Sequence, residues 1–254
     1  MPTIQTPECT QLPAGAVAYP DAQEVFVADQ QELAEHLLPL LSIDANLINP
    51  GWSGRLHLLS PIEPDEGLVG ELTADCGFGS ELLKTNWIGF KIENGRYRLC
   101  GDPRYFFLHP GNADLPEPRR NVRASLQRHY AQEHATYQAS RQRYQELGRL
   151  TWPEDSDYHM TFIDQMAGIA EGYGNWVETV EFPMDIVEAT DDSGDIDVWP
   201  LSPAGRRFEH ALSVPASHYG ISGADLIVMF YEPVEGLVLF LSLIHISEPT
   251  RPER

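Results

Sequence analysis

Basic residues are scarce in this chain of 254 residues, which holds 17 Lys and Arg against 38 Asp and Glu and has a net charge of −21. Only two of the basic residues are Lys. A chain with this balance is repelled as a whole by nucleic acid and by anionic membranes. The composition therefore predicts neither a nucleic-acid partner nor a membrane partner.

Long hydrophobic runs, paired cysteines and a leader-like start are also missing. The longest apolar runs, residues 226–231 and 237–241, have the length of strands and fall short of the ~20 residues of a membrane helix. Cys9, Cys76 and Cys100 are odd in number and lack a Cys-x-x-Cys spacing, which favours reduced thiols. The first residues contain no basic segment followed by an apolar one, as signal peptides do. Together these features predict a cytoplasmic protein.

The common catalytic and cofactor motifs are absent as well. The chain has no Gly-x-Ser-x-Gly elbow, no Gly-x-Gly-x-x-Gly fingerprint, no phosphate-binding P-loop and no His-Glu-x-x-His pair. The acidic run at 191–197 fails as an EF-hand, because its sixth position is Ile196 and its twelfth is Ser202. We therefore predict no cofactor and assign no catalytic residue.

What the sequence does contain is a strong hairpin signal at Asn94-Gly95, since both residues accept the positive φ of a tight turn. With these two as the loop, Glu93 faces Arg96, and Ile92 faces Tyr97. Apolar side chains then share one face and charged ones the other, so pattern and turn support one register. A third strand at residues 105–108 completes the predicted meander.

The remaining pattern indicates an α+β fold, a mainly antiparallel sheet with one long helix and one shorter N-terminal helix. The long helix is predicted at residues 119–147, which lack Gly and Pro and are followed by Gly148. Asp29 and Glu32 match a capping box for the short helix at residues 30–41. Further strands are predicted at residues 23–27, 55–59, 158–163, 175–182, 184–189, 206–214, 225–231 and 237–240. Residues 1–240 form a single α+β domain in this interpretation, with a possible sub-boundary near residues 148–153.

The last residues stand apart from this pattern. Residues 241–251, Leu-Ser-Leu-Ile-His-Ile-Ser-Glu-Pro-Thr-Arg, resemble the in-frame translation of a transposase-type sequencing adapter. The resemblance implies that residues 241–254 are a non-native tail and that the gene is cut short near Phe240. We expect the residues after Phe240 to be poorly packed.

Positive charge gathers in one segment, since seven of the fifteen Arg lie within residues 117–150, which hold only three acids. Arg120, Arg128 and Arg141 project from the predicted helix away from its apolar stripe. They could dock onto the chain's own acidic loops at residues 151–200. Alternatively, they could recruit an acidic protein or ligand, for which the bidentate geometry of Arg is suited.

Two other sets of residues are candidates for function. The run at residues 172–176 combines two Gly with Tyr173, Asn175 and Trp176, which suits close backbone approach and flat contact with a ligand. A metal-assisted hydrolase would need several members of one set to converge: His159, Asp164, His210, His218 and Asp225. The sequence favours a non-catalytic binding or interaction protein, with this hydrolase as the alternative.

Overall fold

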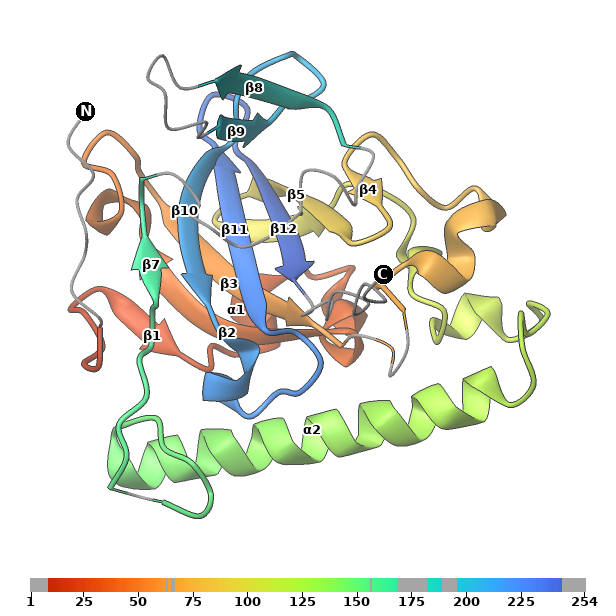
Figure 1. Ribbon diagram of the computed structural model, residues 1–254, viewed down its shortest axis with the longest axis horizontal. Coiled ribbons are helices and arrows are strands. Elements are labelled where there is room, and N and C mark those ends of the chain that lie inside the picture. Colours follow the sequence, from red (N-terminus) through yellow and green to blue (C-terminus); the bar gives the residue numbers. More distant parts are fainter. Residues whose placement is uncertain are drawn as a thin grey trace, which may run out of the picture.

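The computed structural model describes residues 9–62, 64, 67–155, 157–168, 182–188 and 196–243. Within them every strand-to-strand pairing is antiparallel, and a long helix lies apart from the sheets (Figure 1). The α+β class predicted from the sequence is therefore confirmed. In this part of the chain no helix is long and apolar enough to cross a bilayer.

The strands form three sheets in the described residues. The smallest pairs β8 (Met184–Glu188) with β9 (Ile196–Pro200). A three-stranded sheet has the order β1 (Ala16–Ala18), β2 (Leu37–Asp44), β3 (Arg55–Pro61). The largest has the order β4 (Leu83–Lys84), β5 (Trp87–Glu93), β12 (Leu237–Leu243), β11 (Leu226–Glu232), β10 (Glu209–Val214), β7 (Gln165–Met166), and β6 (Arg96–Leu99) lies beside β5.

Helical segments connect and cover these strands. The long helix is α2 (Val122–Leu147), and α1 (Ala22–Val25) is a single turn. Short 3-10 turns make up the others: η1 (Gln31–Glu35), η2 (Ala45–Leu47), η3 (Glu71–Cys76), η4 (Pro103–Tyr105), η5 (Pro110–Asn112) and η6 (Ala216–Tyr219). The prediction of a helix ending at Leu147 before Gly148 is confirmed, and Gly148 takes the left-handed conformation with φ 68°.

The hairpin at Asn94-Gly95 is also confirmed. Its residues have φ values of 52° and 78°, and the register pairs Glu93 with Arg96 and Ile92 with Tyr97. The predicted third strand at residues 105–108 is wrong. That segment leaves the sheet through η4, where the Asp102 carboxylate accepts a hydrogen bond from the Arg104 N–H and closes a turn. In the sheet β5 pairs with β6 and β4, and with β12 from far along the chain.

Two predictions near the N-terminus are wrong. Residues 30–41 were expected to be a helix, but only η1 is helical there and β2 begins at Leu37. A short apolar run fits a buried strand as well as a buried helix, and only partners distant in sequence decide between them. Here β1 and β3 pair with β2 on its two edges. Residues 23–27, expected as a strand, begin instead as α1.

Other predictions have mixed outcomes. The strands at 55–59, 184–189, 206–214, 225–231 and 237–240 are confirmed, with shifted ends, as β3, β8, β10, β11 and β12. Residues 158–163 contain no strand, only a bridge from Ile163 to Cys9. The predicted strand at 175–182 lies almost wholly outside the described residues.

The end of the chain differs from expectation where it can be compared. Strand β12 continues past Phe240 to Leu243, and Leu241 and Ser242 are both buried. The expectation of poor packing is therefore wrong for these two residues, while residues 244–254 lie outside the described part. The resemblance of residues 241–251 to an adapter stays a prediction.

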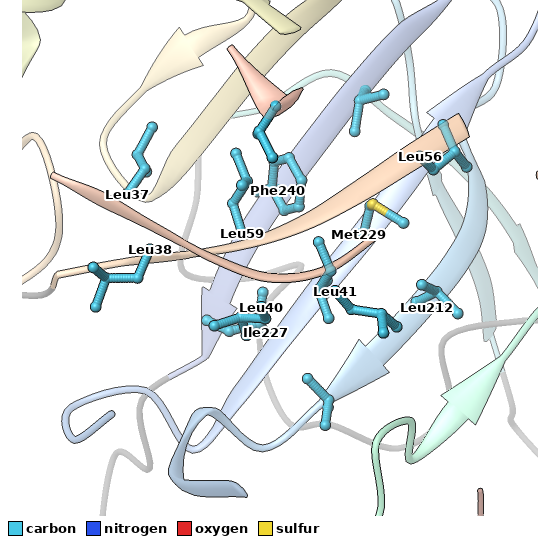
Figure 2. Close-up of a cluster of buried hydrophobic side chains, with 14 of the residues drawn as sticks. Leu37, Leu38, Leu40, Leu41, Leu56, Leu59, Leu212, Ile227, Met229 and Phe240 are labelled. Carbon is cyan, nitrogen blue, oxygen red and sulfur yellow. The ribbon is translucent and has the colours of Figure 1, made fainter. Parts of the chain in front are cut away.

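The main core lies between the three-stranded sheet, which we call the small sheet, and the largest sheet, which we call the large sheet. Figure 2 shows side chains of β2 and β3, such as Leu41 and Leu59, gathered against side chains of the large sheet, such as Met229 of β11 and Phe240 of β12. Because side chains alternate along a strand, the intervening residues of β11 and β12 point to the opposite face of the large sheet. There they form a second cluster with Trp87, Phe182 and Phe208. The large sheet therefore buries apolar side chains on both faces.

Helix α2 runs along one side of the two sheets (Figure 1), where apolar side chains pack and polar side chains form hydrogen bonds. The buried Glu133 carboxylate accepts hydrogen bonds from the Ser222 N–H, at 2.7 Å, and from the Ser222 hydroxyl. The Tyr137 hydroxyl donates to the Pro39 carbonyl at 2.5 Å. These contacts hold the middle of the helix and so determine where its first turn lies.

Replacement of Gly95 tests the hairpin. A Cβ at Gly95 would meet no atom within 4 Å, so the cost of Gly95→Val is backbone strain alone. We expect a loss of about 1–3 kcal/mol in the free energy of unfolding, measured by denaturant titration. Gly95→Asn is the control and should lose less, because Asn tolerates positive φ. Equal losses for the two variants would contradict the assignment.

Replacement of Glu133 tests the docking of α2. Glu133→Ala removes the acceptor of two hydrogen bonds to Ser222, and we expect it to lower the free energy of unfolding by about 1–3 kcal/mol. Gln132→Ala, on the exposed face of the same helix, should change it by less than about 0.5 kcal/mol. A similar effect of both changes on thermal melts would show that Glu133 does not anchor the helix.

Candidate functional site

The start of α2 lacks the side chains that usually complete a helix N-terminus. Asn121, at the N-cap, has the left-handed φ of 63° and makes no side-chain hydrogen bond to the helix, and the first turn has no acidic residue. The N–H groups of a first turn have no acceptor within the helix, and the helix dipole favours negative charge at this end. The electrostatic potential at this end of the helix is therefore positive, and no side chain of the first turn compensates it.

A cavity of about 320 Å³ lies beside this helix start. Its volume is at the small end of the range found for ligand sites, about 300–1,000 Å³. The lining combines charged, polar and apolar side chains from the helix start and from a loop of the N-terminal half: Pro64, Leu72, Arg119, Arg120, Asn121, Val122, Ser125, Leu126 and Arg128. We refer to these nine residues as the α2 pocket.

Arginine supplies the charge of the α2 pocket. Arg120 and Arg128 are exposed, and neither forms an ion pair with a residue that the structure describes. Arg123 on the same turns is used differently. Its guanidinium lies 4.5 Å from the centre of the Phe107 ring and donates to the Asn112 carbonyl at 2.8 Å. Among the described residues Arg120 and Arg128 thus have no acidic partner, whereas Arg123 fixes the helix to the segment that contains Phe107 and Asn112.

The apolar side of the α2 pocket has its own small core. Val122 and Leu126 are buried against Phe107 in a cluster separate from the main core, with Leu72 packed at its edge. A second hollow of only about 20 Å³ continues from this wall toward Tyr105 and Tyr130. The pocket is thus basic at its rim and aliphatic along its floor.

The three arginines predicted as a partner surface fall into two groups. Arg120 and Arg128 line the α2 pocket, whereas Arg141 lies nearly four turns further along the helix. Arg141 Nη2 is 2.6 Å from Oδ1 of Asp21, so this side chain docks onto the chain's own acid. Arg141 therefore docks onto the chain's own body, while recruitment of an acidic partner by Arg120 and Arg128 stays a prediction. Asp21 lies outside the acidic loops that were expected to receive the arginines.

The five residues of the metal-site hypothesis are not brought together. Among the described residues no group of three or more His, Cys, Asp and Glu could hold a metal ion. His210 is buried with Nδ1 3.0 Å from the Ala167 carbonyl, and His218 lies with Nδ1 3.0 Å from the Thr161 carbonyl. His159 and Asp225 are exposed, and Asp164 is near enough to His218 to act on its pKa. The geometry therefore gives the hydrolase alternative no metal centre.

The other predicted ligand site cannot be compared with the structure. Tyr173, Asn175 and Trp176 lie outside the described residues. The role assigned to them from the sequence stays a prediction.

A buried serine–histidine pair was not anticipated from the sequence. Ser42 Oγ lies 2.6 Å from His57 Nδ1, and His57 Nε2 lies 2.9 Å from the Gly95 carbonyl. The carbonyl requires a proton on Nε2, so Nδ1 accepts from the Ser42 hydroxyl. Burial lowers the pKa of His57 to about 4. Both side chains are about 2% exposed, which leaves no room for a substrate, and the pair serves to hold the hairpin against β3.

The residues of the α2 pocket that sequence reasoning missed are its uncharged ones and Arg119. Pro64 and Leu72 come from a segment without clear periodicity, and their approach to the helix start depends on the fold. Two sequence signals did point to this place: the run of Arg from residue 119 and the absence of acids in the first turn of the helix.

Comparisons with protein-family models, with curated proteins and with solved structures found no match to this chain.

Buried histidine gives a pH dependence that can be measured. Burial, together with the charges of His109 and His134, lowers the pKa of His36 to about 3. Between pH 6.5 and 3 the unfolded chain therefore binds a proton at His36 that the folded protein does not. Stability is lost as the pH falls through this window, by about 1.4 kcal/mol per pH unit for one such group.

We expect His36→Phe to remove the share of the pH dependence of stability that His36 contributes, because Phe has no group that binds a proton. A Phe ring can still stack on Phe106, whose ring centre lies 4.7 Å from that of His36, so the variant should fold. The measurement is the free energy of unfolding from denaturant titration at several pH values from 6.5 to 4. Leu147→Phe, at an exposed position without a titratable group, is the control and should leave the slope unchanged. An unaltered slope in His36→Phe would show that His36 is not held neutral.

Proposed function

We propose that this protein is a non-catalytic binding protein that recruits an acidic partner or ligand through the α2 pocket. One observation carries the proposal: Arg120 and Arg128, which form no ion pair within the described part of the chain, flank a cavity of about 320 Å³. A guanidinium offers several donors in a fixed fork that matches a carboxylate or phosphate. Two guanidinium groups without an acidic partner among the described residues, placed beside a cavity, suit the binding of an anion.

The charge of the rest of the chain adds to the argument. At a net charge of −21 the protein repels anions over most of its surface, whereas residues 117–150 carry seven Arg against three acids. Field lines from such a patch steer an acidic partner to one place on the molecule. Selectivity for the α2 pocket then comes from the surroundings as well as from the pocket.

The proposal also includes the cytoplasmic location and the lack of a nucleic-acid partner that were predicted from the sequence. The three cysteines, all in the described part of the chain, form no disulfide, and this supports the predicted cytoplasmic location. An acidic body also makes nucleic acid a poor partner. We include no catalytic step in the proposal.

Neutralising the two arginines tests the proposal. We expect Arg120→Gln with Arg128→Gln to weaken binding of a fluorescein-labelled poly-glutamate peptide at least about fivefold in low salt, each exposed pair contributing up to about 1 kcal/mol. Raised salt should weaken binding to the wild type and have little effect on the variant. The melting temperature should stay within error, because no described ion pair is lost.

The matched control is Arg55→Gln with Arg96→Gln, which makes the same change in net charge away from α2. Arg96 has no described ion pair, and Arg55 has one of 3.8 Å to Asp44. This control should bind the peptide like the wild type. Equal loss in both double variants would show that only net charge matters. A marked fall in the melting temperature of the Arg120 and Arg128 variant would show that these side chains serve the chain's own acids.

A further inference from the structure

The α2 pocket joins positive charge to an apolar floor, and this combination leads from the proposed function, on which the inference rests, to a class of ligand. We infer that the α2 pocket binds a small amphiphilic anion, a carboxylate with an aliphatic tail of about six to eight carbons. The carboxylate meets the arginines at the rim, and the tail lies on the floor.

The rim determines the charge of the ligand. Arg119, Arg120 and Arg128 line the pocket, and Arg120 and Arg128 form no ion pair with a described residue. Three guanidinium groups attract an anion and repel a cation. A guanidinium can also donate to both oxygens of a carboxylate at once. The half-buried Ser125, in the same lining, adds a hydroxyl that can donate to a carboxylate oxygen.

The floor determines what the ligand carries besides its charge. Val122 and Leu126 form a small cluster with Phe107, and the half-buried Leu72 packs at its edge and lines the pocket. A hydrocarbon tail that covers these side chains removes apolar surface from water, which is favourable. Inorganic phosphate has no apolar part, so it would leave the floor uncovered. The lining therefore favours an anion with a hydrocarbon part.

The volume of the cavity limits the size of the ligand. A water molecule takes up about 30 Å³ in the liquid, so a cavity of about 320 Å³ has room for on the order of ten non-hydrogen atoms. Octanoate matches this size. An Asp or Glu side chain presented by a protein has too short a hydrocarbon part to cover the floor. The inferred ligand is therefore a free small molecule.

The test measures binding to the full chain by isothermal titration calorimetry in low salt. The probe is octanoate, hexanoate and acetate shorten the tail, and 1-octanol removes the charge. Full burial of one methylene changes an affinity about fourfold, and we expect about twofold where solvent reaches the ligand. Octanoate should then bind about fourfold tighter than hexanoate and at least about tenfold tighter than acetate. It should bind about three- to fivefold tighter than 1-octanol, which cannot pair with the arginines.

Variants separate the two parts of the pocket. Leu72→Asn removes apolar surface from the floor, so it should weaken octanoate about threefold and leave acetate unchanged. Leu147→Asn, at an exposed position at the far end of α2, is the matched control and should bind both like the wild type. Arg120→Gln with Arg128→Gln should reduce octanoate to the affinity of 1-octanol. Thermal melts check that each variant folds, and if Leu72→Asn does not, the tail-length series on the wild type decides.

The outcomes separate this inference from the proposed function. If the poly-glutamate peptide binds but octanoate binds no tighter than acetate, the site takes anions without a tail, and only the inference fails. If octanoate and 1-octanol bind alike, the arginines do not select the ligand; the inference is overturned, and the peptide alone decides the proposed function. If neither octanoate nor the peptide binds, both fail. Preference for octanoate over acetate and 1-octanol, each lost in its own variant, supports both.

Discussion

The pairing of β12 with β5 is the interaction on which the rest of the structure depends. It aligns Phe240 with Ile88 and Leu241 with Trp87, although the two strands are far apart in sequence. Because this register matches the alternation of both strands, Ile88 and Phe240 face the small sheet while Trp87 and Leu241 face the other way. A shift by one residue would exchange the two faces of β12 and disturb both clusters at once.

The position of α2 follows from the same sandwich of sheets. β2 is packed between the large sheet and the helix, so its backbone is available to the Tyr137 hydroxyl at Pro39. The turn after η6 supplies Ser222 for Glu133. With its middle held in this way, the helix projects its first turns past the sheets and over the segment that contains Phe107. The α2 pocket forms where the first turns of this helix, whose middle is held by Glu133 and Tyr137, lie beside the segment that contains Pro64 and Leu72.

Much of this fold could be predicted from local sequence, and the failures have a common cause. Asn94-Gly95 and the helix ending at Leu147 are specified by turn chemistry and by helix formers close in sequence. The hairpin register and the C-terminal end of the helix were predicted correctly, whereas the helix begins at Val122, three residues later than predicted. The apolar run after Asp29 was assigned to the wrong element, since its strand partners lie beyond its own neighbourhood. Residues 105–108 look like a strand by composition, but the chain leaves the sheet after β6 through the turn of η4.

The same division applies to the candidate site. The excess of Arg at the start of the long helix is visible in the sequence, and so is the lack of acids in its first turn. That Arg141 meets Asp21 while Arg128 has no ion-pair partner in the described part of the chain depends on which segments pack beside each turn. Leu72 and Pro64 carry no local signal, because an aliphatic wall becomes recognisable only when the fold places it beside unused charge.

The apolar floor under Arg120 has a consequence for cooperativity. Phe107, Val122 and Leu126 form a cluster separate from the main core, whereas Tyr137 further along the helix belongs to the main core. A segment held by a satellite cluster can open without unfolding of the whole domain, at a free energy set by its own few contacts. We therefore expect the two ends of α2 to differ in amide-exchange protection, with the first turns opening at a lower free energy than the part of the helix that packs in the main core. Any molecule that bridges those turns would bring them into the cooperative unit.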